Sequence, residues 1–277
     1  MQKRKLQLVV ISDVHLGTYG CHAKELKHYL ESIAPETLIL NGDIIDIWQF
    51  SKNYWPKSHM KVIRQILKLS ENGTKVYYIP GNHDEMLRKF EGLELGNITV
   101  CNKVLMDLNG KKAWFFHGDV FDVCMQHSKW LTRLGAKGYD LLILINSFVN
   151  FVLKQVGHRK ISLSKRIKNS VKSAVKYINN FEITCAAIAI ENQYDYVVCG
   201  HIHHPEIREI ITKEGQVTYL NSGDWIENLS ALEYNNNEWE IFKMQDITVH
   251  DEEDVQTDKN VKQLYKELLL EFKIAGF

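Results

Sequence analysis

The sequence has no excess of charge of either sign, because 34 lysines and arginines balance 34 aspartates and glutamates. A chain with no net charge has no overall field to attract nucleic acid, so we expect no nucleic-acid partner. Cysteine is also scarce: the five residues are odd in number, scattered, and include no Cys-x-x-Cys pair. This usage favours a protein of the reducing cytosol.

Long hydrophobic runs are absent as well. The longest apolar stretch, Leu141 to Leu153, is interrupted by Asn146 and Asn150 and falls short of the roughly 20 residues that cross a bilayer. The basic N-terminus, Met1–Lys5, is followed by no cleavable apolar segment of the signal-peptide kind. We therefore expect a cytoplasmic protein, and a peripheral contact with the cytoplasmic face of the inner membrane stays open.

The first part of the chain alternates strand-like and helix-like segments. Met60–Leu69 has apolar residues three and four positions apart and ends at Asn72-Gly73, a typical helix end. The predicted elements are strands at Leu6–Ile11, Thr37–Leu40 and Lys75–Ile79, and helices at His22–Ile33 and Met60–Leu69. This βαβαβ order predicts a mostly parallel sheet covered by helices.

Later strands are separated from these by a helical insertion. Strands are expected at Ala113–Phe116, Tyr196–Cys199, Glu206–Thr212, Val217–Leu220, Ser230–Tyr234 and Trp239–Lys243, the last four pairing antiparallel. Helical segments are expected at roughly Val123–Leu134, Tyr139–Val156, Leu163–Ile178 and Glu182–Ile190. We therefore predict a core of residues 1–120 and 195–250, a helical cap of residues 121–194, and a tail of residues 251–277 with an amphipathic helix.

Five short polar motifs lie at or near the ends of predicted strands. They are Asp13-Val14-His15, Gly42-Asp43, Gly81-Asn82-His83-Asp84, His117-Gly118-Asp119 and Gly200-His201-Ile202-His203. The carboxyl ends of parallel strands share one edge of a sheet, so these motifs are expected to meet there. In an extended segment, residues two apart point the same way, so Asp13 and His15 could bind one ion.

The motifs together offer enough oxygen and nitrogen ligands for two metal ions. Two adjacent divalent ions are typical of phosphoester chemistry, and mixed nitrogen and oxygen ligands suit Mn²⁺, Fe²⁺ or Zn²⁺. Asp43 is the candidate to bridge both ions. The glycines before Asp43, Asn82 and His201 would permit tight turns. Taken singly, each motif has an ordinary explanation: Asn82 as a turn residue, His117 as a core histidine.

All five motifs in this order resemble the calcineurin-like metallophosphoesterases over about Leu6 to Asp224. The resemblance implies a four-layer αββα sandwich that binds two divalent metal ions. It also implies two ligand sets, Asp13, His15, Asp43 and His203 for one ion and Asp43, Asn82, His117 and His201 for the other. His83, with Asn82 beside it, corresponds to the catalytic position that contacts the phosphoryl group and protonates the leaving oxygen.

A narrower resemblance is to the bacterial UDP-2,3-diacylglucosamine pyrophosphatases of lipid A biosynthesis. It rests on Ser12–Leu16, Gly42–Trp48, His117–Asp119, the helical insertion and Gly200–Pro205. It implies an enzyme that cleaves a lipid-linked nucleotide sugar to UMP and an acylated sugar 1-phosphate, with acyl chains held by the cap. Of the metals that suit the ligands, we expect Mn²⁺, with Fe²⁺ or Zn²⁺ as alternatives. The chain departs from that pattern at His83, where arginine is usual, and a histidine suits a wider range of esters.

Other polar residues have secondary roles in this interpretation. Asp46, Asp84 and Asp119 would orient metal-binding histidines or loops, with turn capping as the alternative. Lys165, Arg166 and Asp122 are candidate substrate contacts. The apolar helix around Leu141–Leu153 either packs inside the cap, lines an acyl-chain pocket or meets the membrane.

Three functions are compared on this basis. The first is the UDP-2,3-diacylglucosamine pyrophosphatase activity. The second is a soluble phosphatase or phosphodiesterase that uses His83 as general acid. The third, a binding module without catalysis, is disfavoured because no expected ligand is missing from the sequence.

Overall fold

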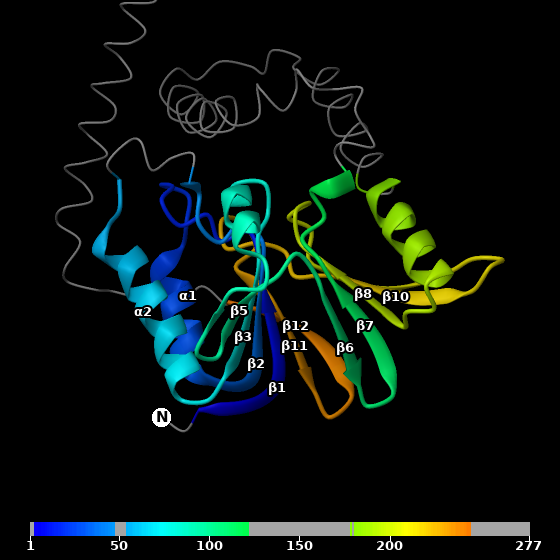
Figure 1. The fold of residues 1–277 in the computed structure, drawn as a ribbon, viewed down its shortest axis with the longest axis horizontal. Helices are drawn as coiled ribbons and strands as arrows, with labels where there is room; N and C mark the ends of the chain where they lie inside the picture. The colour runs from blue at the N-terminus through cyan, green and yellow to red at the C-terminus, as the bar shows by residue number, and fades with distance from the viewer. Residues whose placement is uncertain (1–2, 48–53, 122–177, 179, 245–277) are drawn as a thin grey trace, which may run out of the picture.

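Two β-sheets packed face to face form the centre of the molecule, and helices cover their outer faces (Figure 1). The computed structural model describes residues 3–47, 54–121, 178 and 180–244. The seven-stranded sheet has the order β12-β11-β1-β2-β3-β5-β4, and the five-stranded sheet has the order β6-β7-β8-β10-β9. The chain therefore crosses between the sheets after β5 and returns to the first sheet at β11.

The strands of the first sheet are β1 (Arg4–Ile11), β2 (Ile33–Asn41), β3 (Lys75–Ile79), β4 (Glu94–Leu95), β5 (Ile98–Val100), β11 (Ser230–Asn235) and β12 (Glu238–Lys243). The second contains β6 (Val104–Leu108), β7 (Lys111–Phe115), β8 (Tyr196–Cys199), β9 (Glu206–Ile211) and β10 (Gln216–Asn221). In both sheets the central pairs are parallel, and antiparallel pairs lie toward the edges. The mostly parallel arrangement that the sequence predicts thus holds for the sheet centres.

Helices α1 (Ala23–Ser32) and α2 (Lys57–Glu71) cover the outer face of the first sheet (Figure 1). Leu26 and Leu30 of α1, four residues apart, are fully buried against that sheet. Val62 and Ile66 of α2 have the same spacing and join the same core cluster. Each helix buries one apolar stripe, as its sequence periodicity predicts.

A second core cluster fills the space between the sheets. Leu8 and Val10 of β1 contribute to it, whereas Val9 between them belongs to the helix-covered cluster. Phe115 and Val198 of the second sheet pack into the same inter-sheet core. Strand β1 is therefore buried on both faces, as expected from its apolar run.

The outer face of the second sheet is covered by a helix of residues 180–191. Phe181, Cys185 and Ala189, spaced by four residues, pack in one cluster with Val197 and Tyr219. This helix completes the fourth layer, and the αββα sandwich expected from the sequence is confirmed. The predicted helix at Glu182–Ile190 thus covers the core sheet, although its residues fall within the range assigned to the cap.

The other cap helices, the tail and three candidate substrate contacts, Asp122, Lys165 and Arg166, lie outside the described residues. Strands β4, β5 and β6 were not expected from the sequence. The β6–β7 hairpin turns at Asn109-Gly110, both with positive φ, and this dipeptide is a strong hairpin signal that the sequence interpretation did not use.

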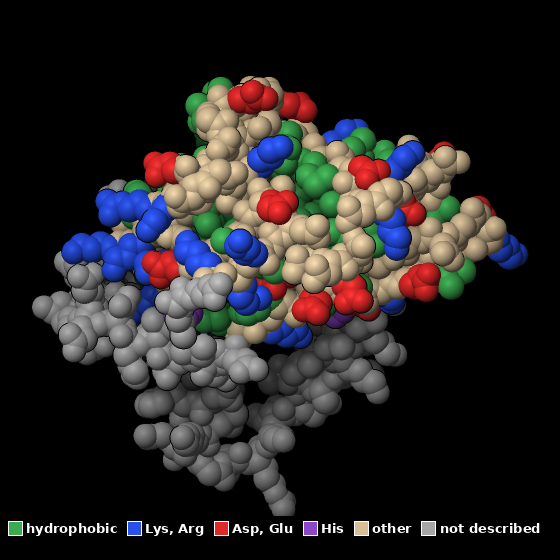
Figure 2. All heavy atoms as spheres, turned by 90° about the horizontal axis from the view of Figure 1, so that it is seen from below, with side chains coloured by type: hydrophobic (Ala, Val, Ile, Leu, Met, Phe, Trp, Pro, Cys, Tyr) green, Lys and Arg blue, Asp and Glu red, His purple; other side chains and the backbone are tan. Residues whose placement is uncertain are grey.

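The surface of the described residues has mixed charge. Figure 2 shows lysine, arginine, aspartate and glutamate side chains spread over one face, with hydrophobic side chains in small separated patches. The four cysteines in the described part of the chain are free thiols. No helix among the described residues combines the length and apolar composition needed to cross a membrane.

Candidate metal centre

The loops that follow β1 and β2 lie side by side at the carboxyl edge of the first sheet. The backbone N–H of Asp13 donates to Gly42 O at 3.0 Å, and that of His15 donates to Asp43 O at 2.9 Å. The β8–β9 loop joins them, since His201 N donates to Asp13 Oδ2 at 3.0 Å. Motifs far apart in the sequence therefore meet at one place, as predicted.

Histidine and aspartate side chains form one continuous group there. Three overlapping sets have ligand atoms within 4.8 Å of one another: Asp13, His15 and His203; His15, Asp43 and His83; and Asp43, His117 and His201. His203 Nε2 lies 3.2 Å from Asp13 Oδ1, and His117 Nε2 lies 3.4 Å from Asp43 Oδ2. Asp43 belongs to two of the sets, a position suited to a carboxylate shared between two cations.

An unusual backbone conformation aims these side chains inward. Asp13, His15, Asp43, His201 and His203 all have left-handed φ values, between 51° and 68°. Such residues are uncommon, and they cluster at functional sites where the surrounding structure holds them. The expectation that Asp13 and His15 converge through strand alternation is therefore wrong in its reason: β1 has already ended, and left-handed turns bring the side chains together.

Glycines beside the ligands provide space as well as conformational freedom. Gly42 has a φ of +88°, and a Cβ there would lie 2.1 Å from His117 Nδ1. Gly81 and Gly200 do not have positive φ values, but a Cβ would lie 2.3 Å from Asp43 Oδ1 or 2.6 Å from Asp13 Oδ2. The predicted turn role holds for Gly42, whereas the other two glycines are required for close approach.

The electrostatics of the group favour bound positive charge. Burial raises the pKa of Asp13, but His203 outweighs that effect and lowers the pKa to about 2. Burial lowers the pKa of His117, yet Asp43 and Asp13 outweigh it and raise the pKa to about 10. The pKa of His203 rises to about 9, against the effect of burial, because Asp13 lies beside it. Buried carboxylates thus dominate the local field.

The donor atoms fit a divalent metal ion. His117 Nδ1 lies 2.8 Å from the backbone oxygen of Asn41. A carbonyl only accepts, so Nδ1 carries the hydrogen and neutral His117 presents the lone pair of Nε2. The buried Nε2 atoms of His117 and His15 have no hydrogen-bond partner among the described residues. One cation beside Asp43 at each nitrogen would satisfy both atoms. A hydrogen bond from the other ring nitrogen, such as that of His117 Nδ1 to Asn41, commonly orients a metal-binding histidine.

Two further aspartates, Asp46 and Asp84, hold the loops around the centre. Asp46 Oδ2 lies 2.9 Å from His83 Nδ1 and 3.7 Å from His15 Nδ1. Asp84 accepts hydrogen bonds from Gly81 N and from the Tyr78 hydroxyl, each at 2.6 Å. These contacts place Asp46 beside two histidines and Asp84 beneath the loop that follows β3.

Asp119 and Asn82 have different surroundings. Asp119 accepts from Arg88 Nη2 at 2.7 Å, which fixes the short 3₁₀ helix η2 (Glu85–Phe90). Asn82 lies in the loop after β3 with its Oδ1 buried, and the next residue, His83, donates its backbone N–H to Asp43 Oδ1 at 2.8 Å. The loop after β3 is thus tied directly to the carboxylate shared between two sets.

Sequence reasoning missed one aspartate at the centre. Asp224 was not among the candidate site residues, but its Oδ2 lies 3.8 Å from His203 Nδ1. Its Oδ1 accepts the backbone N–H of Ile226 at 2.8 Å. A signal was available, because Asp224 follows the end of strand β10 on the same sheet edge.

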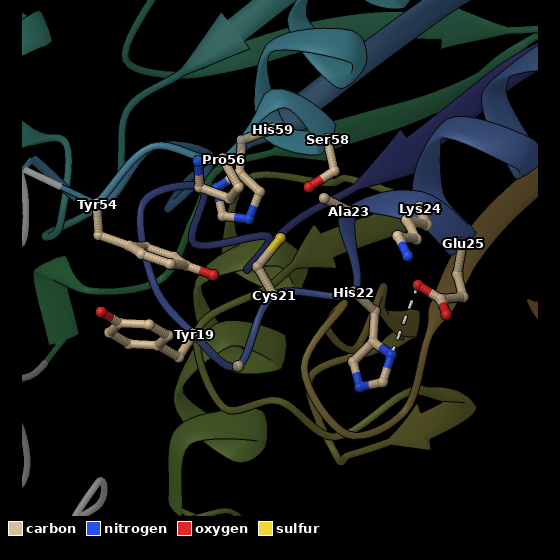
Figure 3. Close-up of a pocket in the computed structure, with 11 residues that line it drawn as sticks. Tyr19, Cys21, His22, Ala23, Lys24, Glu25, Tyr54, Pro56, Ser58 and His59 are labelled. Atoms are coloured by element: carbon tan, nitrogen blue, oxygen red, sulfur yellow. Dashed lines mark ion pairs between the residues drawn. The ribbon is translucent and has the colours of Figure 1, made fainter. Parts of the chain in front are cut away.

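A small pocket of about 180 Å³ lies outside the group of candidate ligands (Figure 3). It is lined by Tyr19, Cys21, His22 and Tyr54, among others, and lies between the first turns of α1 and α2. His59, which also lines the pocket, accepts the backbone N–H of Gly17 through Nδ1 at 2.9 Å, in the loop that follows β1. The pocket contains none of the candidate ligands.

Comparison with known families identifies one match. The family model of the calcineurin-like phosphoesterases matches residues 6–205. This range contains all five motifs, most of β1 and the strands from β2 to β8.

Several curated relatives share the same name. A UDP-2,3-diacylglucosamine hydrolase of Aliivibrio fischeri is 23% identical, covering 86% of this chain and 98% of the relative. A protein of the same name from Vibrio cholerae is 27% identical, covering 83% and 95% respectively. The one from Escherichia coli is 25% identical and covers 70% and 80%.

Solved structures give a weaker likeness. The Escherichia coli phosphoesterase Yfce is 14% identical with a TM-score of 0.45, over 86% of this chain and 93% of that chain. A novel archaeal phosphodiesterase is 13% identical with a TM-score of 0.41, over 85% and 98%.

Proposed function

The chain belongs to the calcineurin-like phosphoesterase family, and on that premise we propose that it uses two divalent metal ions to cleave the pyrophosphate of UDP-2,3-diacylglucosamine. Family membership makes the protein a phosphoester hydrolase. The observation that carries the finer proposal is the continuous group of histidines and aspartates around Asp43. The relatives named UDP-2,3-diacylglucosamine hydrolase support the substrate, because the match covers 95–98% of two of them.

Asp13, His15, Asp43 and His203 would hold one ion, and Asp43, Asn82, His117 and His201 the other. Two bound divalent ions supply a more acidic water as nucleophile and neutralise charge on the phosphoryl oxygens. Mn²⁺ is our proposal for the native metal, because its ligands here are oxygen and imidazole nitrogen.

The protein's own residues prepare the site before substrate arrives. Asp13 and Asp43 stay ionised at neutral pH, since their pKa values are lowered. Asn41 fixes the ring of His117 so that Nε2 faces Asp43. These side chains are almost completely buried, so little reorganisation is needed when charge develops on the phosphoryl group.

His83 is the candidate contact to the reacting phosphate. Its side chain is 28% exposed, whereas that of His117 is 1% exposed, so His83 is accessible to a substrate. Asp46 holds its Nδ1 at 2.9 Å. In the proposed reaction, water adds to one phosphorus and the bond to the bridging oxygen breaks, which yields UMP and an acylated sugar 1-phosphate.

The remaining parts of the proposal concern the cap and the membrane. We propose Lys165, Arg166 and Asp122 as substrate contacts, the cap as the holder of the acyl chains, and a cytoplasmic location with peripheral membrane contact. The proposals on the cap and the membrane contact rest on the sequence pattern of residues 121–194, and the proposed location rests on the scarce, scattered cysteines.

The decisive experiment measures UMP released from UDP-2,3-diacylglucosamine in the presence of Mn²⁺. Metal- and protein-dependent release is expected, and Asp43→Asn serves as the inactive control. Hydrolysis of bis(p-nitrophenyl) phosphate without UMP release would reject the substrate and retain the reaction class.

The histidine at position 83 favours a second candidate function, a phosphodiesterase or phosphatase of another substrate class. An alcohol leaving group has a far higher pKa than a sugar phosphate and gains more from a nearby acid. A panel of nucleotide and phosphoprotein substrates separates the two functions. Faster turnover of an alkyl or aryl ester than of the lipid substrate would favour this second function.

A further inference from the structure

A second group of metal-ligating side chains lies outside the candidate metal centre. Glu182 is on the helix of residues 180–191, His204 lies in the loop before β9, and Glu206 is the first residue of β9. One ligand atom from each lies within 4.8 Å of the other two. His204 Nδ1 is 3.4 Å from Glu206 Oε2 and 4.0 Å from Glu182 Oε1.

One buried carboxylate oxygen of this group accepts no hydrogen bond from the described part of the chain. Glu182 is 1% exposed, and its Oε1 has no hydrogen-bond partner among the described residues. Its other oxygen, Oε2, accepts from Arg208 Nη2. A buried acceptor without a donor is costly, more so when it is charged. Burial, reinforced by Glu206, raises the pKa of Glu182 to about 7, although Arg208 opposes the shift.

From this geometry we propose that Glu182, His204 and Glu206 bind a divalent cation, with zinc as the best match. Bonds of about 2.0–2.2 Å to a tetrahedral ion place its ligand atoms about 3.4 Å apart. The distance from His204 Nδ1 to Glu206 Oε2 equals that value. A modest inward shift of Glu182 would bring its Oε1 to a similar distance from the other two ligand atoms. The half-exposed side chain of His204 leaves the fourth position open to water.

The charge of the group also suits one cation. Two carboxylates and the guanidinium of Arg208 leave one negative charge when His204 is neutral. Arg208 donates from Nη2 to Glu182 Oε2, and its Nε lies 3.8 Å from Glu206 Oε1. It therefore offsets part of the repulsion between the carboxylates and leaves Glu182 Oε1 for the ion.

The ion would connect two layers of the fold next to the candidate metal centre. His204 directly follows His203, and the ring of Phe181, beside Glu182, has its centroid 6.2 Å from that of His201. A cation at this position would therefore fasten the loop that carries two candidate ligands to the helix of residues 180–191. The proposed site joins two elements of the fold and does not depend on the proposed reaction.

The test counts Zn²⁺ ions bound by the full chain in equilibrium dialysis. The wild type is expected to bind one more ion per chain than His204→Gln or Glu182→Gln. Glu209→Gln, an exposed glutamate on the same strand, is the matched control and should bind as many ions as the wild type. Equal counts in the wild type and both folded variants would overturn the proposal. The group would then be a network of ion pairs with Arg208 in which a proton, and not a metal ion, lies between the carboxylates.

A second measurement separates this site from the candidate metal centre. In an Asp43→Asn background, which removes the carboxylate shared between two sets, Zn²⁺ should still raise the Tm by several degrees. The rise should disappear in Asp43→Asn/His204→Gln. Because His204 is half exposed, this substitution is not expected to prevent folding. A rise that persists in the double variant would contradict the proposed ligands.

Discussion

His117 donates a hydrogen bond from Nδ1 to the backbone oxygen of Asn41, 2.8 Å away. Because the acceptor belongs to the backbone at the end of β2, the orientation of the ring follows from the position of that strand. The Asn41 side chain also donates to Phe116 O, at 3.0 Å. The ends of β2 and β7, which belong to different sheets, are thus fixed to each other beside His117, whose Nε2 faces Asp43.

Substitutions of Asp43 and His117 should differ in the number of metal ions lost. Asp43 belongs to both proposed ligand sets, whereas His117 belongs to one. Asp43→Asn should therefore lower the Mn²⁺ content by two ions per chain, and His117→Gln by one. Both should reduce kcat/KM at least ~100-fold, since a bound ion contributes several kcal/mol to transition-state stabilisation.

Elemental analysis of dialysed protein measures this difference, with circular dichroism as the control for folding. Equal metal loss in the two variants would contradict the shared position of Asp43.

Gly81→Ala should impair metal binding without strain in the backbone. The new methyl group would lie 2.3 Å from Asp43 Oδ1 and 2.6 Å from His117 Nε2, so one side chain must leave its place. Gly20→Ala is the matched control, because it also lacks a positive φ and its Cβ would meet only Ile226 Cγ2, at 3.2 Å. Mn²⁺ affinity is the measurement. Wild-type affinity in Gly81→Ala would show that the close approach is not required.

His83→Gln should change the dependence of rate on the leaving group. If His83 assists the departing oxygen, the loss in kcat should approach ~100-fold for a phenyl ester and stay small for a p-nitrophenyl ester. Paired assays on the two diesters give the ratio directly. A uniform loss on both esters would instead assign His83 to binding. His83→Arg should retain pyrophosphate cleavage better than ester cleavage.

The stability of the fold should decrease at mildly acidic pH because of His59. Burial lowers the pKa of this histidine to about 4. The unfolded chain therefore takes up a proton near pH 6.5 while the folded chain does not. Neutral His59 contributes to the free energy of unfolding. This contribution is fully present above pH 6.5 and is lost as the pH falls toward 4, and the total loss is about 3 kcal/mol.

His59→Gln retains an acceptor for the Gly17 N–H but does not titrate. Urea unfolding between pH 7.5 and 4.5 should show a smaller loss of stability in this variant than in the wild type. Parallel curves for the two proteins would contradict this role of burial.

The sequence was sufficient to predict where the site residues meet. Each motif follows a strand, and strand ends gather at one edge, so local pattern and general topology together bring Asp13, Asp43 and His117 near one another. The details required tertiary information. The left-handed backbone at Asp13 and the crowding around Gly81 arise from packing between segments, which spacing along one strand does not reveal.

Other parts of the fold escaped prediction for different reasons. The β6 strand, Val104–Leu108, buries only its two ends and the residues between are at least partly exposed, so its apolar pattern is weak. Asp224 was overlooked because its partner, His203, is contacted across a turn between two different strands. The local turn signal at Asn109-Gly110 was present but was not combined with the weak strand pattern of β6.

The candidate metal centre combines residues from distant parts of the chain, and this has a consequence for its synthesis. Asp13 Oδ2 receives its hydrogen bond from His201, 188 residues further along the chain. At about 5–20 residues per second, the ribosome makes that intervening stretch in roughly 10–40 s. During that interval Asp13 lacks its eventual partners His201 and His203. Loading of the proposed metal set of Asp13 would therefore follow translation of His201 and His203, which would make assembly of the centre a late event in the maturation of each nascent chain.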